Sequence, residues 1–426
     1  MDHIYLFLII IIAVEINLLI IIKVLRKFYN KSFDWRKNKI ITNLITEEDL
    51  KIKIDKNDLI RNKLYFFDPD LGTTNKENIS NSETFYSGNK LIRSKYRIGK
   101  LGERFNNLFN KRSKISTYGD SLTFCRYVND YETWQYFLSK KLKQNVKNFG
   151  VGNYGLDQSY LKYKKNKKKK IDKSKIVIFG FGPETIRRNL SVWKHYFEFG
   201  NVYNFKPRYK QIGENRFKFI RNKIRNLDEL YKANKIFKKI NDYDFFYKNK
   251  FKKYLWKFPY IFSLGINFTR KSKIIIFLTL KLIEIKFNKK IFKICNEKLF
   301  SDLYNVGPLF YDFQDKIKLL RNSEAIDTTL HIVKKIKKEN KKTILIIIPS
   351  QLDFFYYKKF KKSYYDNLIK KISRHVICLD ILKLIPKNIK MKDIYTEKGY
   401  GAHLNKKGNL LLSNIIFEFL KKNEIK

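Results

Sequence analysis

The residues Lys114 to Arg126 read KISTYGDSLTFCR and carry the clearest structural signal of the 426-residue chain. A β-branched and aromatic run, Ile115 to Tyr118, predicts a short strand, and the following Gly119-Asp120-Ser121 predicts a sharp turn that presents a hydroxyl. Open α/β sheets bind ligands at the carboxyl ends of their parallel strands. The position of Ser121 therefore predicts a reactive or ligand-binding hydroxyl, if a base and an oxyanion site meet it there.

Four further apolar runs downstream predict buried strands of the same sheet. They are Asn145–Phe149, Lys175–Gly180, Thr343–Ile348 and His375–Leu379. Amphipathic stretches between them predict helices, and Asn405 can cap a last helix. This alternation predicts an α/β fold, a three-layer α/β/α sandwich with a five-stranded parallel sheet in the order 2-1-3-4-5. The site is expected at the carboxyl edge of that sheet.

The amino-terminal run Ile4 to Ile22, IYLFLIIIIAVEINLLIII, is apolar except at Glu15 and Asn17. Its 19 residues would span about 29 Å as a helix, close to the thickness of a bilayer core. No small-residue cleavage site follows, so we expect residues 1–25 to be an uncleaved, single-pass transmembrane anchor. A core helix of a soluble domain is the alternative. The side of the membrane stays open, because lysine is abundant throughout the chain.

Two further regions have no strand–helix alternation. Residues 26–88 predict a linker and an irregular amino-terminal extension, because Phe67 to Glu83 is rich in turn formers. Residues 89–426 predict the main domain, with a mainly helical insertion at about 189–340. Within the insertion, the run Ile274 to Leu280 is too short to cross a bilayer, and an ordinary insertion helix is favoured over an interfacial one.

The composition narrows the function classes. The chain has 91 Lys and Arg against 40 Asp and Glu, a formal net charge of +51. These basic residues are spread along the chain without a nucleic-acid-binding motif, so we expect a compositional bias and no specific nucleic-acid partner. Three widely spaced cysteines argue against a disulfide framework and a zinc cluster. No metal-ligand spacing is present, and no cofactor is expected.

Three other loops would meet Ser121 at the sheet edge. They are the glycine-rich turn 150–155, the segment Gly180–Thr185 and the segment Gly401–Leu404. His403 lies in a polar loop, and an imidazole within reach of a serine can remove its proton near neutral pH. The backbone amides of Ser121 and of the Gly152-Asn153 turn could stabilise an oxyanion.

The blocks GDSL (Gly119–Leu122), NFGVGNYGLDQ (Asn148–Gln158) and GAHLNKKGN (Gly401–Asn409) together resemble the SGNH/GDSL hydrolase family. The resemblance covers about Lys90 to Lys422 and implies the three-layer fold expected above. It also implies ester hydrolysis, or sometimes acyl transfer, through a serine.

Carried over by position, the resemblance implies that Ser121 is the nucleophile and first oxyanion donor, and that His403 is the base. In the second block, Asn153 stands at the place of the donor glycine, with Gly152 beside it. The third block usually offers an asparagine, but Glu184 stands there, and a carboxylate donates only when protonated. Glu184 would bind substrate hydroxyls, position Arg187, or form a surface ion pair.

The fourth block usually has an aspartate that orients the histidine, but this place is Tyr400. His403 would then work in a Ser–His dyad or borrow a carboxylate, with Glu397 and Asp353 as candidates. Plainer interpretations are an ordinary turn serine and a packing histidine. An aromatic stretch with Trp193 could stack on sugar rings, although such stripes are more often core.

The sequence thus predicts a membrane-anchored SGNH-type serine esterase that acts on an ester-bearing small molecule or glycan. Deacylation of a surface glycan or lipid-linked saccharide would suit the anchor. Acyl transfer at the same site, a catalytically weak glycan-binding relative and a basic membrane-surface scaffold are the alternatives.

Overall fold

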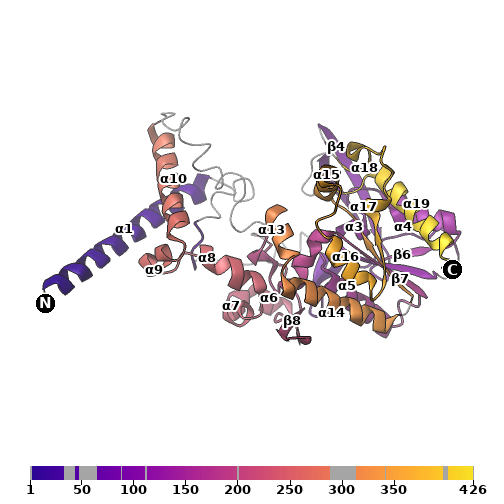
Figure 1. The fold of residues 1–426 in the computed structure, drawn as a ribbon, viewed down its shortest axis with the longest axis horizontal. Coiled ribbons are helices and arrows are strands. Elements are labelled where there is room, and N and C mark those ends of the chain that lie inside the picture. Colours follow the sequence, from indigo (N-terminus) through magenta and orange to yellow (C-terminus); the bar gives the residue numbers. More distant parts are fainter. Residues whose placement is uncertain are drawn as a thin grey trace. The chain divides into compact units, whose positions relative to one another are not determined.

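A computed structural model describes residues 2–32, 44–47, 65–87, 89–110, 113–198, 201–287, 313–340, 342–396 and 402–425 (Figure 1). The chain divides into two compact units. The helical unit comprises residues 1–54, 193–204 and 228–312, and the sheet unit comprises residues 55–192, 205–227 and 313–426.

The sheet unit is built on five parallel strands. In spatial order they are β6 (Val146–Asn148), β5 (Ile115–Gly119), β7 (Ile176–Phe181), β10 (Thr343–Ile347) and β11 (Ile377–Asp380). In chain order this arrangement is 2-1-3-4-5, which confirms the predicted topology. The three central strands are completely buried, as expected for strands covered on both faces.

Helices cover both faces of this sheet, which makes three layers (Figure 1). On one face, α4 (Trp134–Leu142) and α19 (Lys406–Lys422) pack their apolar stripes on the isoleucines of β5, β7 and β10. On the other face lie α5 (Leu156–Lys168), α14 (Ser323–Glu339) and α16 (Asp366–Ser373). Alternate residues of a strand point to opposite faces, so the same strands build both cores.

Regular strands occur in the amino-terminal region that the sequence predicts to be irregular. β1 (Tyr65–Asp68) pairs antiparallel with β2 (Gly72–Asn75), and β3 (Ile79–Ser87) pairs antiparallel with β4 (Lys90–Ile98). The turn formers connect these short strands, and Asn78 adopts the left-handed conformation (φ 52°) between β2 and β3. The expectation of an irregular extension is therefore wrong for residues 65–87.

The insertion is divided between the two units. Its part in the sheet unit includes a hairpin of β8 (Arg208–Gly213) and β9 (Arg216–Ile220), followed later by α13 (Phe313–Leu319) and α14. Its part in the helical unit contains the short helices α7 (Phe237–Asn241), α8 (Lys252–Tyr254) and α9 (Tyr260–Gly265) and the longer α10 (Phe268–Phe287).

The helical unit also contains the amino-terminal helix α1 (Asp2–Ser32). The segment His3–Phe28 is long and apolar enough to cross a membrane, and it is the one such helix in the described part of the chain. Its carboxyl-terminal half packs on α10, where Ile22, Leu25, Ile274 and Phe277 form a buried cluster with Trp256.

Candidate active site

The serine of the GDSL block begins a short helix directly after the central strand. β5 ends at Gly119, and Asp120 caps α3 (Ser121–Phe124). The Asp120 carboxylate accepts the backbone N–H of Leu122 at 2.8 Å and that of Gly182 at 3.4 Å. Burial raises the pKa of Asp120, and the guanidinium of Arg188, 3.7 Å away, opposes this shift. Asp120 thus joins the turn after β5 to the turn after β7.

Glycine is required at the tight point of this turn. A Cβ on Gly119 would lie 2.0 Å from the carbonyl oxygen of Gly180 and 2.1 Å from Oγ1 of Thr123. Thr123 Oγ1 donates to the same Gly180 carbonyl at 2.9 Å. Strand β7 therefore lies close enough to hold the half-buried Ser121 in one position.

His403 reaches Ser121 from the loop before α19. Its Nε2 lies 2.8 Å from the Ser121 hydroxyl oxygen, although the two residues are 282 positions apart. Thr396 N–H donates to the His403 carbonyl at 2.9 Å, and His403 N–H donates to Thr396 Oγ1 at 3.2 Å. The Tyr127 ring packs edge-on against the imidazole, with centroids 5.1 Å apart. The unprotonated Nε2 tautomer would accept the Ser121 proton.

Of the two carboxylates that the sequence suggests for His403, Asp353 is engaged elsewhere. It accepts the Ser350 amide at 2.6 Å at the start of α15 (Gln351–Phe360), and it also accepts the Tyr364 hydroxyl. Glu397 and Tyr400 lie outside the described residues.

Sequence reasoning missed another carboxylate, Glu83 on β3. Glu83 accepts Nε of Arg126 at 2.9 Å and the Tyr96 hydroxyl at 2.7 Å. Burial would raise its pKa, but the hydrogen bonds and charge of Arg126, the Tyr96 hydroxyl and the charge of His403 hold the pKa below its usual value. No sequence block marked this residue, because it lies in the region that reads as irregular.

The predicted oxyanion turn, residues 150–155, lies beside Ser121, but the Gly152 amide already has a hydrogen-bond partner. Val151 N–H donates to the Gly119 carbonyl at 3.0 Å, which ties the turn to β5. The Gly152 N–H bonds to the hydroxyl of Tyr65 on β1, and burial raises the pKa of Tyr65 to about 12. A Cβ on Gly152 would lie 2.3 Å from that hydroxyl. Asn153 adopts a left-handed conformation (φ 68°). The Gly152 amide thus meets a neutral tyrosine hydroxyl.

Glu184 is held in ion pairs rather than left to contact a substrate freely. It lies in the 3-10 helix Pro183–Leu190, 2.6 Å from Lys316 Nζ and 3.7 Å from Arg187. Burial would raise its pKa, but Arg187, Lys316 and Arg188 hold it well below its usual range. The ionised carboxylate cannot donate a hydrogen bond to an oxyanion.

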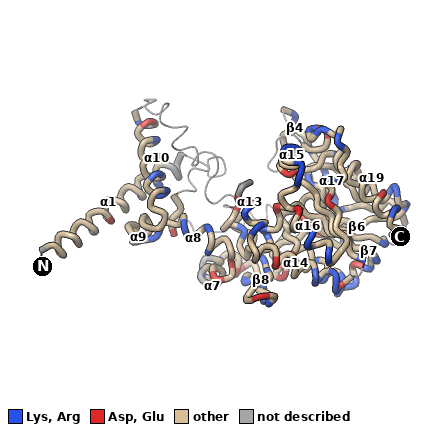
Figure 2. Tube along the Cα trace, in the orientation of Figure 1, with Lys and Arg blue, Asp and Glu red and all other residues tan. Residues whose placement is uncertain are grey.

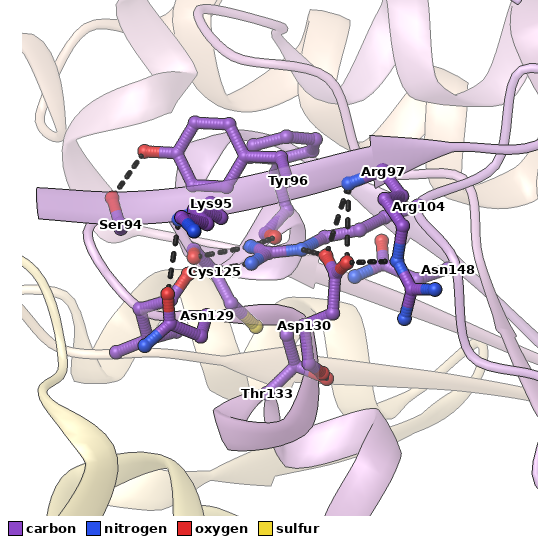
Figure 3. A network of polar contacts seen from close by, with 12 residues as sticks. Ser94, Lys95, Tyr96, Arg97, Arg104, Cys125, Asn129, Asp130, Thr133 and Asn148 are labelled. Carbon is purple, nitrogen blue, oxygen red and sulfur yellow. Dashed lines mark hydrogen bonds and ion pairs between the residues drawn. The ribbon is translucent and has the colours of Figure 1, made fainter. Parts of the chain in front are cut away.

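A buried arginine supports the segment that follows α3. The guanidinium of Arg104 donates to the carbonyls of Phe124 (2.7 Å), Cys125 (2.6 Å) and Val128 (2.5 Å) and to Asp130 (3.2 Å), as Figure 3 shows in part. One side chain thus satisfies three backbone carbonyls in the segment after α3, which the curved backbone there does not pair with its own N–H groups.

Two other features bear on the substrate. Trp193 and His195 are stacked and buried in the helical unit, with exposed fractions of 0% and 2%, so they cannot stack on a sugar. Among the described residues, no group of three or more His, Cys, Asp or Glu is placed to hold a metal ion.

Comparisons with known proteins find a similarity among solved structures. No family model and no curated protein matches the chain. A solved structure assigned to the G-D-S-L family of lipolytic proteins, from Desulfitobacterium hafniense DCB-2, is similar over 72% of this chain and 99% of that chain, with 11% identity and a TM-score of 0.30. At this identity and TM-score the likeness carries no argument about fold or activity.

Proposed function

We propose that this protein is a serine ester hydrolase of the SGNH type, anchored to a membrane by α1. The observation that carries the proposal is the 2.8 Å contact between the Ser121 hydroxyl and His403 Nε2 at the carboxyl edge of the parallel sheet. A serine, a base and a turn of backbone amides at one sheet edge are the parts that acyl transfer needs.

In the proposed reaction, Oγ of Ser121 attacks the carbonyl carbon of an ester while His403 Nε2 takes the hydroxyl proton. The tetrahedral intermediate collapses to an acyl-serine, and His403 returns the proton to the departing alcohol. Water then attacks the acyl-serine with His403 again as base, which releases the acid and restores Ser121. The Glu83 carboxylate favours the imidazolium that forms in both steps, because its charge is opposite.

The substrate class we propose is an acylated surface glycan or lipid-linked saccharide, because α1 would hold the enzyme at a membrane where such esters are found. Acyl transfer at the same residues differs only in the acceptor, since a hydroxyl of a second substrate replaces water. Product analysis separates the two reactions: free acid indicates hydrolysis, and an acylated acceptor alcohol indicates transfer.

The test is labelling with a fluorophosphonate probe, which reacts with activated serines. We expect the detergent-solubilised full-length protein to be labelled, and Ser121→Ala and His403→Ala to lose the label. Ser350→Ala is a matched control, because the Ser350 side chain caps α15 and is not part of the proposed Ser–His pair. A folded wild-type protein that stays unlabelled, or a His403→Ala variant that labels as fast as wild type, would overturn the proposal.

A second candidate is a catalytically weak relative that binds an acylated glycan without cleaving it. Two observations favour it: the Gly152 amide is engaged by Tyr65, and Glu184 is ionised where the family block would supply a donor. Intact-protein mass spectrometry after incubation with p-nitrophenyl acetate discriminates the candidates. One added acetyl group on Ser121 supports the enzyme, and an unmodified protein that still binds the glycan supports the weak relative.

A further inference from the structure

The helical unit carries a second exposed apolar surface beside α1. It is formed by residues 258–268, which comprise α9 and its two flanks and are called the α9 segment below. Its apolar side chains Phe258, Phe262, Ile266 and Phe268 are 65%, 73%, 54% and 61% exposed. Several large apolar side chains exposed within one short segment favour a contact with protein or membrane.

Glu15 of α1 holds the start of this segment. The Tyr260 N–H donates to Oε1 of Glu15 at 2.6 Å, and the Ile261 N–H donates to Oε2 at 2.7 Å. These are the first two amides of α9, which have no acceptor inside their own helix. The second polar residue of the apolar run Ile4 to Ile22, Asn17, donates to the Ala13 carbonyl at 2.8 Å. Both interruptions of the apolar run are therefore satisfied within the helical unit.

The position of Glu15 along α1 gives the depth in the membrane at which the α9 segment would contact this helix. Counting from the ends of His3–Phe28, Glu15 lies 12 residues after the first and 13 before the last, or about 18–20 Å from each end. A carboxylate at mid-membrane needs a partner, and helix amides in lipid need an acceptor because no water reaches them. Glu15 and the α9 amides meet both needs. In water each group would be hydrated without the other.

Two neighbouring polar side chains, Lys271 and Ser263, are turned inward. Lys271 of α10 is 1% exposed, and its ammonium donates to the carbonyls of Ser263 at 2.7 Å and Leu255 at 3.1 Å. Ser263 itself pairs with the backbone of Lys257. The large exposed side chains of the α9 segment are its phenylalanines and isoleucine, which could face hydrocarbon. Asn267 is also exposed, and the half-exposed Lys257–Glu47 ion pair lies at the amino-terminal edge of the segment.

We propose that the α9 segment inserts into the hydrocarbon layer of the membrane that α1 spans, docked on Glu15, with its four apolar side chains against lipid acyl chains. This inference rests on the proposed span of α1. With six residues, α9 is about 9 Å long, so it enters one leaflet and does not cross. The protein then holds the membrane by two elements.

The test measures the depth of spin labels in the full-length protein in phospholipid vesicles. Cys295 and Cys378 are replaced by serine, and Cys125 stays because it is buried. Nitroxides are placed by Phe262→Cys, by Ile9→Cys as the reference for the α1 span, and by Tyr86→Cys on β3 as the aqueous reference; all three positions are more than 60% exposed. Collision rates are measured with oxygen, which partitions into lipid, and with a polar nickel chelate.

We expect the Phe262→Cys label to collide several-fold more often with oxygen than with the nickel chelate, as at position 9. A position 262 that behaves like position 86, with position 9 in lipid, overturns this inference alone. Low collision rates with both reagents at position 262 also overturn it, because a second copy or another protein would then cover the segment. A position 9 in water overturns the α1 span itself.

Glu15→Ala in the Phe262→Cys background tests the docking. Without its acceptor the α9 segment should leave the membrane, and the nickel collision rate at position 262 should rise several-fold, while position 9 stays unchanged. Glu15→Gln keeps one acceptor oxygen and should give a smaller rise. An unchanged rate in Glu15→Ala would overturn the role of Glu15.

Discussion

The charge of Glu83 on β3 interacts with that of His403, although β3 is far in the sequence from both Ser121 and His403. Its carboxylate is fixed by Arg126 and by the Tyr96 hydroxyl. Such a carboxylate can favour an imidazolium through space without touching it. In the proposed reaction, Glu83 would take the part that the resemblance assigns to an aspartate of the fourth block.

Replacing Glu83 should weaken catalysis. In Glu83→Gln the imidazolium loses a nearby negative charge and faces Arg126 uncompensated, so kcat/KM should fall about tenfold, which is about 1.4 kcal/mol. The measurement is hydrolysis of p-nitrophenyl acetate. Glu339→Gln is the control, because Glu339 pairs with Lys167 at a similar exposure, 26% against 24% for Glu83. Equal losses in both variants would contradict the role of Glu83.

The same carboxylate predicts a pH dependence of stability. The folded-state pKa of Glu83 lies below its usual value of 4.5, because Arg126 outweighs the effect of burial. Its contribution is therefore present above the unfolded-state value and is lost as pH falls through the folded-state value. We expect wild type to exceed Glu83→Gln by about 1–2 kcal/mol in unfolding free energy at neutral pH. Urea unfolding should show this difference shrinking below pH 4.5, and a constant difference would contradict the linkage.

The turn between β5 and α3 is the element on which the candidate site depends. In Gly119→Ala, the new Cβ would meet the Gly180 carbonyl at 2.0 Å, and backbone of a buried central strand cannot yield. We expect a loss of more than about 3 kcal/mol of unfolding free energy, or no folded protein. Circular dichroism during thermal unfolding measures it.

Gly182→Ala is the matched control for that turn. Gly182 has φ −80°, which any residue adopts, and its added Cβ would meet first the flexible end of Leu122 at 3.3 Å. This variant should stay within about 1 kcal/mol of wild type. Equal stability of both variants would show that the turn after β5 is looser than the 2.0 Å approach implies.

The strands of the sheet and the loops of the candidate site show what the sequence could predict. Continuous apolar runs such as Ile176–Phe181 reveal buried parallel strands, because both faces of each strand need apolar side chains. Turn residues before Ser121 and the polar loop with His403 mark the two side chains that lie 2.8 Å apart in the structure. The strand prediction and the site prediction each rest on residues that lie within a few positions of one another in the sequence.

The parts that could not be predicted depend on contacts between distant segments. Strand β4 alternates few buried residues with exposed ones, so no apolar run marks it or its partner β3. Without β3 there is no reason to bring Glu83 toward His403. The Tyr65–Gly152 hydrogen bond likewise joins residues 87 positions apart, and neither local composition nor periodicity encodes it.

The whole chain has a net charge of +51, but few of its basic residues belong to the candidate site. Figure 2 shows Lys and Arg along both units, with Asp and Glu interspersed among them. Spread charge attracts polyanions through counterion release, but it cannot read a base sequence. Specific recognition would require a groove-reading helix or an aromatic platform in addition to charge.

This charge distribution predicts that the protein binds DNA weakly, in a salt-dependent way and independently of the DNA sequence. Fluorescence anisotropy with two duplexes of unrelated sequence should give dissociation constants within about twofold of each other. Both should rise at least about tenfold between about 50 and 200 mM salt, because each neutralised phosphate releases counterions. Tyr65→Phe and Ser121→Ala should bind as wild type does, since neither changes a charge. A duplex preferred by more than about tenfold at the higher salt would contradict a purely compositional origin, and would assign the basic surface a function of its own.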